Sequence, residues 1–151
     1  MSALLQGTGL QWPLAARFVP GQLPTLEVFK DCVLLKDQWE PNKRHAKIAD
    51  LFDGTGFECF VNHVHLPFDG SRESVIACLE YAATLREVLG PLTPDRRFRV
   101  IVSLEEESTF PKSACTVRFH QIRTGENSMS ENLEGYASEA ILVFDVTGAA
   151  R

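Results

Sequence analysis

The segment that most constrains this chain is one long amphipathic stretch, Ser71–Leu89, which predicts a helix. Its apolar residues recur at the three- and four-residue spacing of one helix face, and Gly90-Pro91 follows as a stop signal. A helix with an apolar stripe must bury that stripe against another layer. The rest of the chain is therefore expected to supply a sheet for this helix to cover.

Three segments after the helix have the composition and alternation of strands: Phe98–Leu104, Ala114–Ile122 and Ala140–Val146. Three further strands are predicted at Gly9–Val19, Phe29–Lys36 and Phe57–Leu66. Short helices are predicted at Lys43–Phe52, which Gly54 would end, and around Met129–Leu133.

The order of these segments decides the fold class. Runs of strands with hairpin-like connections favour antiparallel pairing over a doubly wound parallel sheet. We therefore predict an α+β protein with a single domain over residues 1–151. It consists of a mostly antiparallel open sheet with one long helix packed on one face and one or two short helices.

Composition and cysteine usage indicate a globular protein of a reducing compartment. Of 151 residues, 44% are hydrophobic and 23% charged, which is ordinary for a globular domain. No apolar run approaches the roughly 18–20 residues of a membrane helix, and glycines and a proline interrupt the N-terminal stretch where a signal peptide would lie. The four cysteines have apolar neighbours and no CxxC spacing: Cys32, Cys59, Cys78 and Cys115. We predict buried thiols and a cytoplasmic location.

The charge is acidic and unevenly spread. The net charge of −5 argues against a general binder of nucleic acid or of an anionic membrane, which needs a basic face. Between Thr124 and Ala150 there are five acids and no Lys or Arg, and Glu105–Glu107 lies just upstream. The C-terminal third is therefore where an acidic surface is expected.

Residues that could carry chemistry are few. His63 and His65 form an H-x-H on a predicted strand, so both imidazoles would share one face, and His120 could complete a metal site. The alternative is a pair of hydrogen-bonded histidines on a half-exposed sheet face. The cysteines lack the electropositive setting of a reactive thiol, and the G-x-G pieces lack the third glycine of a phosphate loop. No catalytic residue and no cofactor are expected.

The stretch Glu134–Asp145, together with the small size and acidic charge, resembles immunity proteins of bacterial toxin–immunity systems, including contact-dependent growth inhibition. The resemblance implies a noncatalytic protein that binds and neutralises one cognate, basic toxin through an acidic face. The contact residues would then be Glu105, Glu106, Glu107, Glu126, Glu131, Glu134 and Glu139. Solubility is the other reading of such surface acids.

Two alternative functions stay open. One is a small enzyme or a ligand- or metal-binding domain, with a site lined by His63, His65, His120 and Arg118. The other is a scaffold or oligomer subunit, because the edges of an open sheet can pair with another chain.

Overall fold

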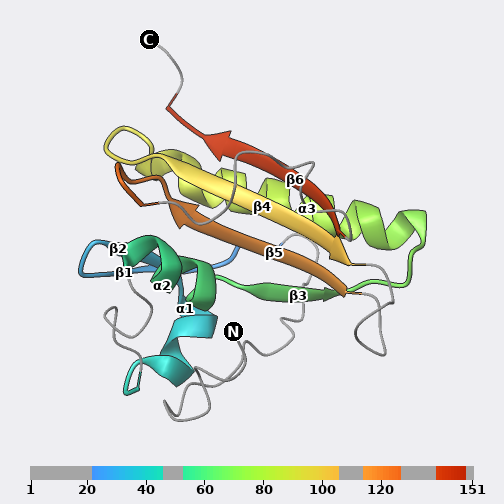
Figure 1. Ribbon diagram of the computed structural model, residues 1–151, viewed down its shortest axis with the longest axis horizontal. Helices are drawn as coiled ribbons and strands as arrows, with labels where there is room; N and C mark the ends of the chain where they lie inside the picture. The colour runs from blue at the N-terminus through green and yellow to red at the C-terminus, as the bar shows by residue number, and fades with distance from the viewer. Residues whose placement is uncertain (1–21, 46–52, 106–113, 127–138, 149–151) are drawn as a thin grey trace.

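A four-stranded antiparallel sheet, with strand order β3–β5–β4–β6, forms the centre of the fold. The structure is a computed structural model, and it describes residues 22–45, 53–105, 114–126 and 139–148. The strands are β3 (Val64–Pro67), β4 (Phe98–Glu105), β5 (Ala114–Gln121) and β6 (Glu139–Val146). Helix α3 (Arg72–Leu89) lies behind this sheet in Figure 1, followed by the short helix η4 (Gly90–Leu92). The α+β fold predicted from the sequence, with one long helix on a mostly antiparallel sheet, is confirmed.

Helix α3 begins and packs as its sequence predicts. The Ser71 hydroxyl accepts a hydrogen bond from the Ser74 backbone N–H at 3.1 Å, which satisfies one of the free donors of the first turn. Its buried side chains, including Leu85 and Leu89, pack on Val100, Val117 and their neighbours to form the main core. The core side chains of β4 and β5, such as Val100 and Val117, lie on the sheet face that α3 covers, and Ile101 and Thr116 on the other face are buried as well.

A separate two-stranded hairpin precedes the main sheet. It consists of β1 (Leu26–Phe29) and β2 (Cys32–Leu35), followed by α1 (Lys36–Trp39) and η2 (Glu40–Asn42). The single strand predicted at Phe29–Lys36 is wrong, because the chain turns at Lys30, whose φ of 56° is left-handed. Lys30 and Asp31 together make a two-residue turn that apolar composition does not reveal.

Helix α2 (Gly54–Val61) replaces most of the strand predicted at Phe57–Leu66. Gly54 opens this helix instead of ending an earlier one, and Asp53 caps it by accepting a hydrogen bond from the Gly56 backbone N–H at 2.6 Å. Only Val64–Pro67 is a strand. The alternating pattern predicted a strand here. Residues 58 and 62 are four apart, so they reach the same side only when the segment is helical.

Those two residues, Glu58 and Asn62, join the hairpin to the main sheet with their side chains. On the hairpin side, the Glu58 carboxylate accepts from the Val33 N–H and the Asn62 side-chain oxygen accepts from the Leu35 N–H, each at 2.8 Å. On the β5 side, Glu58 accepts from the Gln121 N–H at 2.6 Å. Two polar side chains on one helix thus take the place of a neighbouring strand between β2 and β5.

The Asn62 amide group completes this bridge by donating to both sides. It reaches the Val33 carbonyl at 2.9 Å and the Phe119 carbonyl at 3.2 Å. Asn62 is fully buried, so each of its polar atoms needs a partner, and each has one. Both polar atoms of the Asn62 side chain are therefore hydrogen-bonded, and its burial carries no penalty for an unpaired amide.

Glu58 is also fully buried, and its charge is balanced by Arg123. The two guanidinium nitrogens of Arg123 donate to the carboxylate at 2.8 and 3.1 Å. Burial lowers the pKa of Arg123, but the hydrogen bond to Glu58 and its charge outweigh burial and raise that pKa above its usual range. Removing one partner of a buried pair of this kind costs about 3–5 kcal/mol, since the other charge is left uncompensated.

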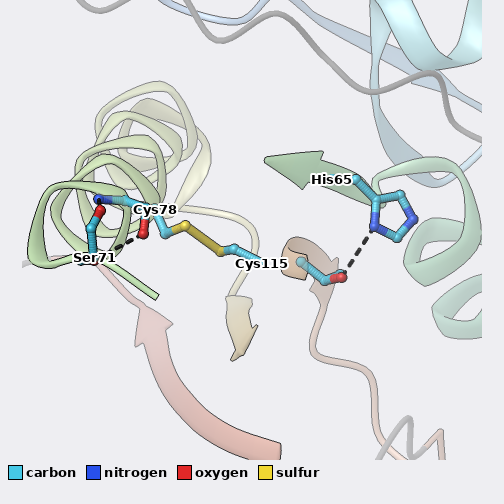
Figure 2. The surroundings of a disulfide bond; sticks show 6 residues. His65, Ser71, Cys78 and Cys115 are labelled. Atoms are coloured by element: carbon cyan, nitrogen blue, oxygen red, sulfur yellow. Dashed lines mark hydrogen bonds between the residues drawn. A yellow bond between two sulfur atoms is a disulfide. The ribbon is translucent and has the colours of Figure 1, made fainter. Parts of the chain in front are cut away.

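The cysteine prediction is wrong for one pair. Cys78 of α3 and Cys115 of β5 form a disulfide between the helix and the sheet, with their Cα atoms 6.6 Å apart (Figure 2). Both are buried in the main core, where the helix and strand bring them face to face. Spacing along the chain could not show this contact, since the two residues are 37 apart. Cys32 and Cys59 remain free thiols.

Three predicted elements lie wholly or largely outside the described residues. These are the strand at Gly9–Val19, the helix at Met129–Leu133 and all but the start of the helix at Lys43–Phe52, of which residues 43–45 form a turn. Among the described residues, no helix is both long and apolar enough to cross a membrane.

Candidate functional site

Two of the predicted contact acids lie opposite each other at one end of the sheet. Glu105 is the last residue of β4 and Glu139 the first residue of β6, and the antiparallel register pairs them directly. The strands thus bring together two residues that are 34 apart in the sequence, as the residue numbers show. The other C-terminal acids of the set lie outside the described residues: Glu106, Glu107, Glu131 and Glu134.

The Glu139 carboxylate is held in place by its neighbour on β4. The Ser103 hydroxyl donates a hydrogen bond to it at 2.6 Å. Ser103 thereby orients the Glu139 carboxylate at this end of the sheet, where the register sets an acidic residue of β4 opposite it.

Glu126 lies at the other end of the sheet and faces inward. Its carboxylate accepts from both the N–H and the hydroxyl of Thr55, at 2.9 and 2.6 Å, at the start of α2. Burial raises the pKa of Glu126, but the hydrogen bonds from Thr55 and the charge of Arg123 outweigh it and lower that pKa. Glu126 serves the attachment of α2, and the structure does not bring it together with Glu139.

The end of the sheet opposite Glu139 carries arginines whose charges are largely balanced. Arg99 donates to both carboxylate oxygens of Asp145, at 2.8 and 3.1 Å. Arg96 lies 3.4 Å from Asp31. The positions of acids along the chain do not show which of them are paired. Asp145 is the partner of an arginine, whereas Glu139 lies opposite another acidic residue in the register.

The histidines gather on the sheet face opposite α3. His65 pairs in register with Thr116, and their side chains are 3.4 Å apart (Figure 2). The His63 and His65 rings lie 4.4 Å apart, as the H-x-H spacing predicts for two residues on one face. Continuing the β3–β5 register by two residues places His63 beside Arg118.

His63 sits in surroundings that disfavour its charged form. Burial is the largest cause, followed by the neighbouring His65 and Arg118, and together they lower its pKa to about 3. The imidazole of His63 is therefore neutral at physiological pH. A neutral imidazole has one nitrogen that donates and one that accepts, so it can take part in ligand binding or general base chemistry.

His120 lies two residues beyond Arg118 on β5, about 7 Å along the strand, and its Nδ1 lies 2.9 Å from the Gln121 carbonyl oxygen. In the part of the chain that the structure describes, no three His, Cys, Asp or Glu side chains come together as a metal site. Cys32 is a poor candidate for a nucleophile. Burial and the charge of Glu58 raise the pKa of its thiol to about 11, so the thiol stays protonated.

Residues 22–150 match the family described as Uncharacterized protein PM0498. The chain belongs to this PM0498 family. A search of curated proteins and a search of solved structures each found no match. The family's description names no activity, so the function has to be argued from the geometry of this chain.

Sequence reasoning about this PM0498-family chain missed the residues that build the site. Nothing in the sequence shows that Glu58 and Arg123 are paired with each other across 65 residues, or that Glu58 is buried. Asn62 was assigned to a strand. The available signal was the spacing of four residues between Glu58 and Asn62. This spacing is informative only if residues 54–61 are known to form a helix.

We predict an acid-sensitive contribution of His63 to stability. The pKa of His63 is about 3 in the folded protein, against about 6.5 in an unfolded chain. Between these values the unfolded state binds a proton that the folded state does not, so the free energy of unfolding falls as the pH falls from about 6.5 towards 3. His63→Gln should flatten this part of the profile in urea titrations at several pH values.

His45→Gln is the matched control, since His45 is exposed. It should leave the wild-type profile unchanged. A profile for His63→Gln that runs parallel to the wild type down to pH 4 would contradict the assigned surroundings of His63.

Proposed function

We propose that this chain is a noncatalytic protein-binding domain whose acidic sheet end binds a basic partner protein. The observation that carries the proposal is the register of β4 and β6, which sets Glu105 directly opposite Glu139. Glu106 and Glu107 follow immediately in the chain.

The charges of the described residues are spread unevenly along the sheet. The register places two acidic residues at one end, whereas the arginines at the other end are matched with Asp145 and Asp31. A cationic surface seated on the acidic end complements its charge. Such complementarity speeds the encounter and selects the partner more than it adds raw affinity.

The finer form of the proposal is an immunity protein, and it follows from the resemblance of Glu134–Asp145 to that class. The partner is then a cognate basic toxin of a bacterial toxin–immunity system, whose active site the complex would cover. Nucleic acid and membrane surfaces are not the expected partners, because the proposed contact surface is itself anionic.

Charge reversal tests this proposal. The chain is used to capture basic proteins from its source cells, and the purified partner is then measured against Glu105→Lys/Glu139→Lys by surface plasmon resonance. We expect the association rate to fall about tenfold or more at low salt, because electrostatic steering is reversed. Stability should fall only by about 1 kcal/mol, the loss of the hydrogen bond from Ser103 to Glu139.

The matched control is Glu80→Lys/Glu87→Lys, which changes the net charge equally on the exposed side of α3. It should slow association much less. Equal association rates for the two double variants would contradict an acidic contact at the end of the sheet.

We also propose that the chain acts in the cytoplasm. The free thiols of Cys32 and Cys59 support this location, while the Cys78–Cys115 disulfide is of a kind that is rare there. Alkylation of thiols in intact cells before lysis, followed by mass spectrometry, shows which cysteines are reduced in the cell. We expect Cys32 and Cys59 to be trapped as thiols, and their recovery in oxidised form would overturn the cytoplasmic location.

A further inference from the structure

Arg118 carries a charge that no described side chain balances. It lies on β5, on the sheet face away from α3, and is only partly exposed. None of the ion pairs among the described residues includes it. Its Nε is closed off from solvent and has no hydrogen-bond partner. A guanidinium is charged at every physiological pH, and its N–H groups can only donate.

His63 shows the same deficit next to it. Its Nε2 is buried and also lacks a hydrogen-bond partner in the described part of the chain. The groups that shift its pKa are His65 and Arg118, besides burial, and no carboxylate is among them. Buried polar atoms in native proteins are nearly always satisfied, so two orphaned nitrogens side by side call for a shared acceptor.

The chemistry of the missing acceptor follows from these two groups. It must offer oxygen atoms, since the Arg118 Nε can only donate and the neutral His63 can carry its hydrogen on Nε2. It should be negatively charged, because it would offset a charge that is otherwise unpaired in a half-buried place. A metal cation is excluded on the same grounds, since Arg118 would repel it.

We propose that His63 and Arg118 bind a small oxyanion, the carboxylate or phosphate group of a small molecule, on the sheet face opposite α3. The Arg118 Nε and the His63 Nε2 each donate to an oxygen of this group. His65 and Thr116 lie in the next row of the register and border the site. Both side chains are partly exposed, whereas their two donor nitrogens are closed off from solvent, so the bound group is enclosed at these atoms. The proposed binding does not depend on a protein partner, and the Glu139 carboxylate is the nearby acid to note, since it accepts from Ser103, which pairs in register with Thr116.

Nuclear magnetic resonance of the imidazole groups tests the site. The full chain, labelled with ¹⁵N, is titrated with inorganic phosphate and separately with acetate, at constant ionic strength maintained with chloride. We expect saturable shifts of the His63 and His65 signals with at least one of the two anions. The arm that saturates at lower concentration identifies phosphate or carboxylate as the preferred group.

Two variants separate the site from general charge effects. Arg118→Gln should weaken binding by about tenfold or more, the loss of one charged hydrogen bond. Arg97→Gln removes an equal charge from a side chain that is 63% exposed and should leave the dissociation constant unchanged. His63→Asn gives an independent loss of the second donor, should Arg118→Gln fail to fold.

The proposal is overturned by any of three results. The first is linear, non-saturating shifts in the wild type with both anions. The second is an equal loss of affinity in Arg97→Gln and Arg118→Gln. The third is shifts confined to His45 and His120.

Discussion

The structure depends on the bridge that Glu58 and Asn62 form between the hairpin and the main sheet. Strand β2 presents backbone donors and acceptors towards β5, but the two strands are not paired with each other. Side chains from α2 satisfy these groups on both strands. A bridge of this kind needs a helix, since only residues four apart on a helix reach both strands at matching heights.

Arg123 is what makes the bridge tolerable. A fully buried carboxylate without a cation would cost several kcal/mol, and two guanidinium nitrogens with two backbone amides saturate it instead. The bridge also positions the histidines. Asn62 is tied to Phe119 of β5, and the chain that leaves it runs directly into His63, so His63 and His65 are laid beside Arg118 and Thr116.

The acidic end of the sheet is independent of this bridge. Glu105 and Glu139 are set by the pairing of β4 with β6, at the far end from Arg123. The matched, buried network of Glu58, Asn62 and Arg123 holds the parts of the fold together, and the acidic positions of β4 and β6 lie outside it.

Particular elements show how far the fold could be predicted from local sequence patterns. Helix α3, β4, β5 and β6 were predicted correctly, since each is long and its apolar residues follow one period. Helix α2 and the β1–β2 hairpin were not, because residues 54–66 alternate by composition while Glu58 and Asn62 require a helix. The H-x-H pairing was foreseen from strand geometry, but the unpaired state of Arg118 and the burial of Glu58 depend on contacts between distant segments.

Hydrogen exchange of three amides tests the bridge most directly. The N–H groups of Val33, Leu35 and Gln121 donate to side chains of α2, not to a neighbouring strand. We predict that these three amides are protected to the same degree as those of Val102 and Val117, in the middle of β4 and β5. Exchange at the rate of an unstructured peptide, while the central strands stay protected, would contradict the bridge.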